Sequence, residues 1–229
     1  MTDRAGRRVL ALGSITTVLM VLAIVGLFLI APEDGVQGQV QRIFYFHVSV
    51  AIISMVAFAV ACVAGVMYLR RPREWWDDLG YITVRVGLMF AVMTVITGSI
   101  WAKGQWGTWW VWSDPRLATY TIVILLYAAY FVLRSSAEGS RQARFSAVYA
   151  IVAFASVPVS FYAVRIAQSY VHPVVFTSSG ARMPNSMLLW FTVSFVGLMF
   201  LFATLVQFEL LQHRAERALR EAKLRLERG

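Results

Sequence analysis

The sequence predicts an all-α integral membrane protein with six transmembrane helices, both termini in the cytoplasm and a tryptophan-rich loop on the outer face. Composition is the first reason. Hydrophobic residues make up 59% of the chain, charged residues only 14%, and the mean hydropathy is +0.66. A soluble domain carries about 25% charged residues. Long uncharged runs and an uneven distribution of arginine are the second and third reasons, and together they indicate that lipid surrounds most of the chain.

Six apolar segments are long enough to cross a bilayer, since a transmembrane helix needs about 20 apolar residues. The first two contain no charged residue, the third contains only Arg85, and the fifth contains Pro158. We treat residues 1–229 as a single polytopic membrane domain. Its predicted spans are about 9–30, 43–69, 79–101, 117–133, 145–164 and 187–208.

The basic residues define the predicted orientation, because cytoplasmic loops carry an excess of Lys and Arg. With the N-terminus in the cytoplasm, the inner segments hold fifteen of the 21 Lys and Arg residues. The outer segments hold Arg42, Lys103, Arg116, Arg165 and Arg182. An even number of spans then returns the C-terminus to the cytoplasm. The net charge of +9 is therefore spread as in a membrane protein, and without a recognition motif it excludes nucleic-acid binding.

Residues 209–229 form a predicted basic, cytoplasmic helical tail. Glu216 with Arg220 and Glu221 with Arg225 are spaced four residues apart, in the order that stabilises a helix. We favour a solvated continuation of the sixth span. The alternative is a docking surface for a cytosolic partner.

Tryptophan is concentrated in one stretch, residues 101–116, which reads WAKGQWGTWWVWSDPR. An interfacial belt would distribute tryptophans over several helix ends. Here five of the eight gather in a predicted loop, where Gly104 and Gly107 allow tight turns. The clustered indoles offer flat aromatic faces to a planar macrocycle, although sugars and quinones also stack on tryptophan. Asp114 is expected to accept an indole N–H or to pair with Arg116.

Two of the three histidines fall on the predicted outer face, His47 at the start of the second span and His172 before the sixth. Pro173 biases His172 toward an extended backbone. Two neutral imidazoles from separate segments suit the axial positions of haem iron. Zinc usually takes three or four protein ligands, and no third ligand is evident. Outer arginines suit the two carboxylates of haem.

These features occur together in a known family. Residues Trp106–Leu117, "WGTWWVW…D.RL", resemble the WWD signature of haem-handling membrane proteins. With "APEDGVQGQVQRIFYFHV" before the second span and "SYVHPVVF" before the sixth, the whole chain resembles the cytochrome c maturation protein C (CcmC) family. The resemblance implies haem b held on the outer face of the cytoplasmic membrane and loaded onto the haem chaperone CcmE. It also implies an ABC transporter, CcmA with CcmB, and the small membrane protein CcmD as partners.

The resemblance assigns roles residue by residue. His47 and His172 match the family's essential histidines, as haem-iron ligands. The other cofactor-binding positions are Trp106, Gly107, Trp109, Trp110, Trp112, Arg42, Arg116 and Asp34. The family commonly has W-x-W-D-x-R-L, whereas Ser113 intervenes here and shifts Asp114 and Arg116 by one position relative to the tryptophans. Pro115 is expected to absorb the extra residue in a turn.

The predicted function is haem delivery by a protein that is not an enzyme, because the sequence shows no nucleophile–base pair and no phosphate loop of an ATPase. One alternative is a permease that carries haem across the membrane, which would need polar residues near the midplane. The other is an electron-transfer subunit of the b-type cytochrome class, which would need histidines deeper in the spans.

The orientation is open to direct test. With Cys62 replaced, a single cysteine at position 105 should react with an impermeant external reagent, and one at position 140 should not. The expectation follows from the distribution of Lys and Arg. The reverse labelling pattern would invert the topology.

Overall fold

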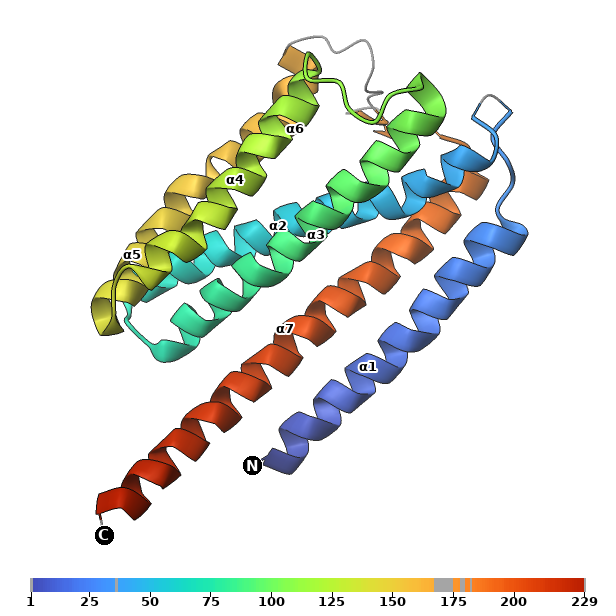
Figure 1. Cartoon of the computed structure of the whole chain (residues 1–229). Helices are drawn as coiled ribbons and strands as arrows, with labels where there is room; N and C mark the ends of the chain where they lie inside the picture. The colour runs from blue at the N-terminus through green and yellow to red at the C-terminus, as the bar shows by residue number, and fades with distance from the viewer. Residues whose placement is uncertain (1, 36, 167–174, 178–179, 182, 229) are drawn as a thin grey trace.

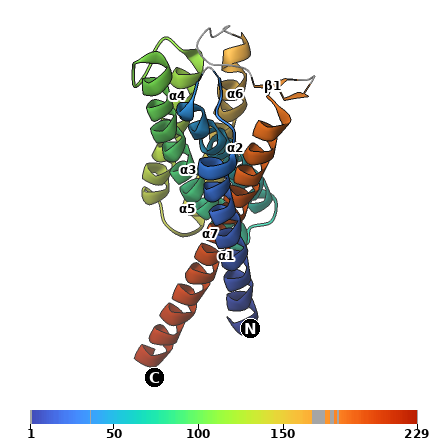
Figure 2. The same cartoon turned by 90° about the vertical axis from the view of Figure 1, so that its right-hand side faces the viewer.

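The computed structural model describes residues 2–35, 37–166, 175–177, 180–181 and 183–228, and it is an all-α bundle (Figure 1). Six of its helical segments are long and apolar enough to cross a membrane, as the sequence predicts. Both chain ends lie at the same end of the bundle, and the tryptophan-rich segment lies at the other (Figures 1 and 2). This arrangement is the one that an even number of spans produces.

The described elements follow one another in a simple order. They are α1 (Thr2–Val25), η1 (Gly26–Ile30), η2 (Gln39–Gln41), α2 (Arg42–Arg70), α3 (Glu74–Trp106), α4 (Pro115–Ser135), α5 (Gly139–Phe154), α6 (Ser156–Ile166), β1 (Phe176–Thr177), β2 (Gly180–Ala181) and α7 (Asn185–Arg228). The two short strands pair with each other in antiparallel fashion. The predicted basic tail is helical and continues the sixth span without interruption in α7.

The third span is longer than predicted. The prediction ended it at Trp101, whereas α3 continues to Trp106 and stops at Gly107, whose φ of 72° is the left-handed conformation that ends many helices. Gly104 and Trp106 are therefore helical, like Trp101, and the prediction that they belong to a loop was wrong. Falling hydropathy marks the end of the apolar run here, not the end of the helix.

The predicted fifth span is divided into α5 and α6 at Ala155. Pro158 explains the division, because it has no N–H to donate to the carbonyl oxygen of Phe154, four residues earlier. Both helices pack against α4, but only α5 also packs extensively against α2.

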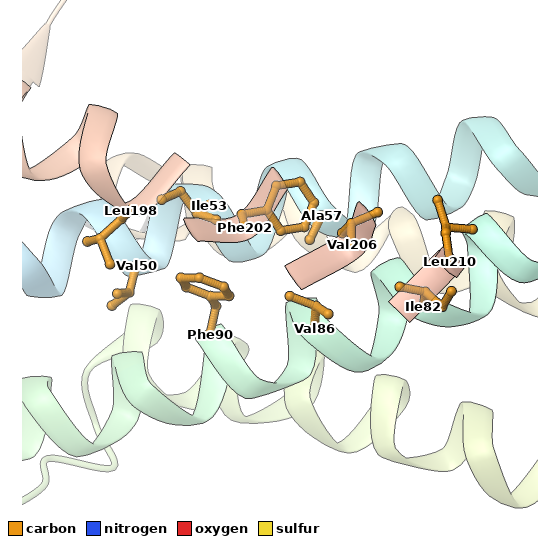
Figure 3. Close-up of a cluster of buried hydrophobic side chains, with 10 residues drawn as sticks. All are labelled: Val50, Ile53, Ala57, Ile82, Val86, Phe90, Leu198, Phe202, Val206 and Leu210. Carbon is orange, nitrogen blue, oxygen red and sulfur yellow. The ribbon is translucent and has the colours of Figure 1, made fainter. Parts of the chain in front are cut away.

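The centre of the bundle is the antiparallel pair α2 and α3, which α7 joins to form the main core. Figure 3 shows this core, to which α2 contributes Val50, Ile53 and Ala57. Residues Ile82, Val86 and Phe90 come from α3, and Leu198, Phe202, Val206 and Leu210 from α7. Helix α1 packs along the outside of α7, where the hydroxyls of Thr16 and Thr204 lie 2.9 Å apart.

The α2–α3 pair is close because α3 has glycines where the helices meet. A Cβ on Gly87 would lie 2.9 Å from Cβ of Ala57, and one on Gly80 would lie 3.7 Å from Cβ of Ala64. Small residues at such positions let helix backbones approach in a membrane. Helix α2 makes a similar contact with α5, since a Cβ on Gly65 would lie 2.8 Å from the carbonyl oxygen of Ala147.

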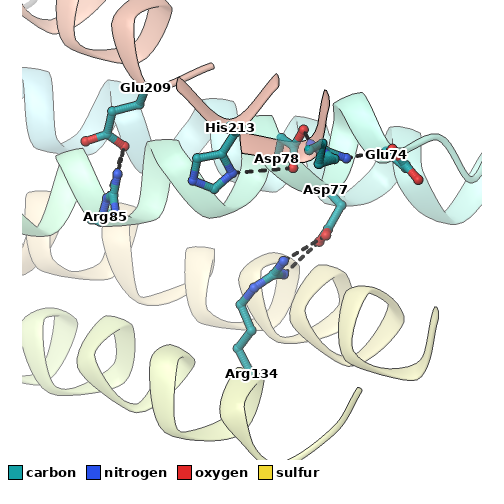
Figure 4. A network of polar contacts seen from close by, with 8 residues as sticks. Glu74, Asp77, Asp78, Arg85, Arg134, Glu209 and His213 are labelled. Atoms are coloured by element: carbon teal, nitrogen blue, oxygen red, sulfur yellow. Dashed lines mark hydrogen bonds and ion pairs between the residues drawn. The ribbon is translucent and has the colours of Figure 1, made fainter. Parts of the chain in front are cut away.

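Charged side chains gather at the end of the bundle that carries the termini (Figure 4). Arg134 of α4 forms a two-pronged ion pair with Asp77 of α3, with both N–O distances 2.7 Å. Arg85, the one charge predicted within the third span, donates from Nε to Glu209 of α7 at 3.0 Å. Pairing of this kind is what makes a charge tolerable in an apolar environment.

The tail takes part in the same network. Arg217 contacts Asp78 and Glu74 of α3, the latter at 2.6 Å, and the His213 ring nitrogen lies 3.8 Å from a carboxylate oxygen of Asp78. Helix α7 is thereby fastened to α3 beyond the predicted end of the sixth span.

Two glycine substitutions should differ in their effect on stability. Gly65→Ala forces Cβ against a backbone oxygen and should lower the free energy of unfolding by about 1–3 kcal/mol. Gly80→Ala meets only ordinary van der Waals contact and should be neutral or stabilise by roughly 0.5–1 kcal/mol. Unfolding in detergent micelles measures both, and equal effects would contradict the close α2–α5 contact.

Candidate functional site

A pocket lies between α2, α3, α4 and α6 at the tryptophan-rich end of the bundle. Its walls include the predicted site residues His47, Trp106, Trp109, Trp110 and Arg116. Most of the remaining lining is aliphatic or aromatic, and it extends along α2 from Phe44 to Phe58. The structure thus brings together residues from three segments that the sequence could only assign to the same face.

The imidazole of His47 lies against α3. His47 is in the second turn of α2 and is half-buried. Its Nδ1 is 3.1 Å from the hydroxyl oxygen of Thr97, and a Cβ on Gly98 would lie 2.7 Å from its Cε1. The ring is therefore held between a hydroxyl and a stretch of helix backbone that has no side chain.

The tryptophans are divided between a helix and the loop that follows it. Trp101 and Trp106 are on α3, and their rings meet edge to face with centroids 5.0 Å apart. In the loop, the rings of Trp110 and Trp112 are 5.8 Å apart. Trp109 lines the pocket although it is 57% exposed, whereas Trp112 is 71% exposed and is not part of the lining. Trp109 therefore stands at the rim of the pocket.

The loop ends at a capped helix. Asp114 is only 2% exposed, and its carboxylate accepts hydrogen bonds from the backbone amides of Arg116 and Leu117 at 2.9 and 3.1 Å. Pro115 occupies the first position of α4, where a missing N–H costs nothing. The carboxylate of Asp114 is thus the N-cap of α4, and Pro115 begins the helix instead of forming a separate turn.

Arg116 connects two walls of the pocket. Its guanidinium donates to the carbonyl oxygen of Phe161 on α6 at 3.5 Å, and both residues line the pocket. Ser160 of α6 and Thr119 of α4 make a further contact at 3.3 Å between their hydroxyls. A positive charge is thereby placed at the tryptophan-rich end of a mainly apolar pocket.

Among the described residues, Arg42, Asp34 and Gly107 do not line this pocket. Arg42 donates to the carbonyl oxygen of Phe28 at 2.8 Å and lies 3.7 Å from Glu33, so it joins α2 to the end of the first span. The carboxylate of Asp34 accepts from the amide of Gln37 at 2.7 Å and closes the turn before α2. Gly107 ends α3, and His172 lies outside the described residues. Binding roles for these four residues stay predictions.

The sequence analysis missed several residues of the pocket. Thr94, Gly98 and Trp101 recur at intervals of four and three residues and therefore share one face of α3. Tyr120 lies deeper and is 3.0 Å from the hydroxyl of Ser54. The spacing lies within the predicted third span, but the sequence does not show which face of that helix borders a pocket.

The described residues hold no group of three or more His, Cys, Asp and Glu side chains that could bind a metal ion unaided. What they offer is one imidazole, one guanidinium and several indole faces around an apolar space. This combination suits a flat, largely apolar ring with a metal at its centre and acidic substituents at one edge. It does not suit a bare cation, which would need more ligands.

Comparison with known proteins identifies similar chains. The family model described as heme exporter protein C (CcmC) matches residues 1–225. Heme exporter protein C of Bradyrhizobium diazoefficiens is 30% identical over 192 residues, which cover 81% of this chain and 72% of that protein. The Escherichia coli protein of the same name is 33% identical over 140 residues, 59% of this chain and 55% of its own length. A putative cytochrome c biosynthesis ccmC-like mitochondrial protein of Marchantia polymorpha is 27% identical over 172 residues, 75% and 73% of the two chains.

The cap of α4 gives a prediction that separates structure from binding. Asp114→Ala removes the acceptor for two backbone amides and should destabilise the protein by about 1–2 kcal/mol. Asp114→Asn keeps a capping oxygen and should cost much less. Unfolding in detergent compares the two variants, and an equal loss would mean that the negative charge matters more than the cap.

Proposed function

Since the chain belongs to the haem exporter protein C (CcmC) family, we propose that it handles haem in cytochrome c maturation, as a multi-pass protein of the cytoplasmic membrane. Its relatives carry haem export and cytochrome c biosynthesis in their names. The finer proposal is that the protein presents haem b on the outer face of that membrane. It then loads the haem onto the chaperone CcmE.

The observation that carries the proposal is the meeting of His47, the tryptophans and Arg116 in one pocket. The residues fit haem in three respects. A neutral imidazole is a normal axial ligand of haem iron. Indole faces match the flat macrocycle, and a guanidinium matches a propionate. Haem is cargo in this proposal, and the iron supplies the bond by which the protein holds it.

Each side chain then has a distinct task. His47 provides one imidazole from a helix that is firmly packed in the core, and His172 is proposed to provide the second from the segment before α7. Trp106, Trp109 and Trp110 cover the ring and exclude water from it. Arg116 orients the acidic edge toward the end of the bundle where the tryptophans lie. Trp112, which is 71% exposed, is available to a protein partner.

The proposed partners are CcmE, the ABC transporter subunits CcmA and CcmB, and the small membrane protein CcmD. We propose no enzymatic step for this chain, so ATP hydrolysis belongs to the transporter. The position of His47, in the second turn of α2, favours delivery over the electron-transfer alternative, which needs ligands near the midplane. The pairing of Arg85 with Glu209 gives that charge a structural role, which disfavours the alternative in which Arg85 lines a path for haem across the membrane.

The proposal predicts the absorption spectrum of the purified protein. The wild-type chain should bind haem and show a low-spin spectrum with two imidazole ligands. His47→Gly and His172→Gly should each convert it to a five-coordinate or water-ligated form, and added imidazole should restore it. A haem-free protein that takes up no haem on reconstitution would overturn the proposal.

Tryptophan variants provide the matched control. Trp109→Ala should weaken haem retention and CcmE loading, at a cost of about 1 kcal/mol for a lost stacking face beyond the area buried. Trp75→Ala should leave both unchanged, because Trp75 is at the other end of α3 and is comparably exposed, at 40%. Equal effects of both substitutions would indicate a general role in anchoring the protein.

A further inference from the structure

Two adjacent residues of α3 hold the imidazole of His47, and neither belongs to a recognised haem motif. The hydroxyl oxygen of Thr97 is 3.1 Å from Nδ1 of His47. The same oxygen is 2.8 Å from the carbonyl oxygen of Met93 and 3.2 Å from that of Thr94. Gly98 brings the helix backbone against the ring.

The number of hydrogens decides how these contacts are arranged. A threonine hydroxyl has one hydrogen to donate, and a carbonyl oxygen can only accept. The shortest contact, to Met93, therefore takes the hydroxyl hydrogen, and the lone pair of the hydroxyl oxygen is left for the ring. His47 must then donate from Nδ1–H. In a neutral imidazole only one nitrogen carries hydrogen, so Nε2 has the lone pair.

We propose that Thr97 is a positioning residue that fixes His47 as the Nδ1–H tautomer and makes Nε2 the ligand atom. The tautomer stands on the contacts within this chain, and only the identity of the metal, haem iron, rests on the proposed function. A second interaction of this kind orients a ligating histidine and raises its basicity. Helix α3 thereby selects the nitrogen that α2 presents.

Gly98 fixes the plane of the ring. A Cβ at this position would lie 2.7 Å from Cε1 of His47, which is closer than side-chain carbons approach, and 3.2 Å from Nδ1, which is a tight contact. Gly98→Ala should therefore displace the imidazole from Thr97. Loss of the hydroxyl and gain of a methyl group are two independent ways to break the same contact.

The first experiment needs no haem. Nitrogen-15 labelling of histidine, in the full chain in detergent and at a pH where imidazole is neutral, reports which ring nitrogen carries hydrogen. The chain has three histidines, and a His47→Ala sample assigns the signal of His47. Nδ1–H should dominate in the wild type and in Thr97→Ser, and Thr97→Val and Gly98→Ala should shift the population toward Nε2–H. A dominant Nε2–H form in the wild type would overturn the proposal.

The second experiment uses the haem-loaded chain. Thr97→Val keeps the side-chain shape, and it should release haem to apomyoglobin about 10-fold faster than the wild type. The haem midpoint potential should rise, because a less basic imidazole stabilises ferric iron less. Thr97→Ser should restore both values toward those of the wild type.

Thr83→Val is the matched control. Thr83 is on the same helix, is buried and bonds to the carbonyl oxygen of Leu79 at 2.7 Å, as Thr97 bonds to Met93, but it is far from the pocket. Wild-type release and potential in Thr97→Val, or an equal change in Thr83→Val, would refute the positioning role. Failure of the wild type to bind haem would refute the proposed function instead, and the tautomer experiment would still decide the role of Thr97.

Discussion

The close antiparallel contact of α2 and α3 is the constraint on which the other parts of the structure depend. It follows a row of glycines on α3. Passing along α3 from Gly80 to Gly87, Gly98 and Gly104, the residues met on α2 and just before it are Ala64, Ala57, His47 and Val40. The register is constant along the whole interface. Gly98, which lies against His47, is therefore one of a series of glycines that otherwise serve helix packing. The position of the His47 ring is thus set by the packing of α2 on α3.

The two ends of this helix pair are chemically different. At the end that carries the termini, ion pairs between α3 and its neighbours α4 and α7 neutralise the charges, and Arg134 also stacks 4.7 Å from the ring centre of Tyr81. At the other end, indoles and aliphatic side chains enclose a space with one guanidinium. At the first end, charged side chains join the helices to one another. At the second end, a single guanidinium lies beside the pocket.

The sequence alone predicted the features that depend on the solvent. Six apolar runs predicted six spans, because every backbone group in lipid must be bonded within a helix. The ends of α3 and the break at Ala155 were missed. A helix can continue beyond its apolar run, and a proline does not indicate at which residue the helix is interrupted. For the site, residue type and predicted face grouped His47, Trp109 and Arg116, and these three residues line the same pocket. Thr97 gave no signal, because a threonine in an apolar helix is ordinary until its neighbour across the interface is known.

The break at Ala155 has a mechanical consequence for the pocket. The wall built from α2 and α3 belongs to the main core, whereas the opposite wall is built from α4 and α6, and α6 is separated from α5 by the break. A displacement of α6 would carry Ser160 and Phe161 outward and leave the histidine and its threonine undisturbed. The pocket thus has one wall in the main core and one wall that includes a helix preceded by a break. A large, rigid ligand would then enter and leave by displacing α6, while its contacts with α2 and α3 are kept.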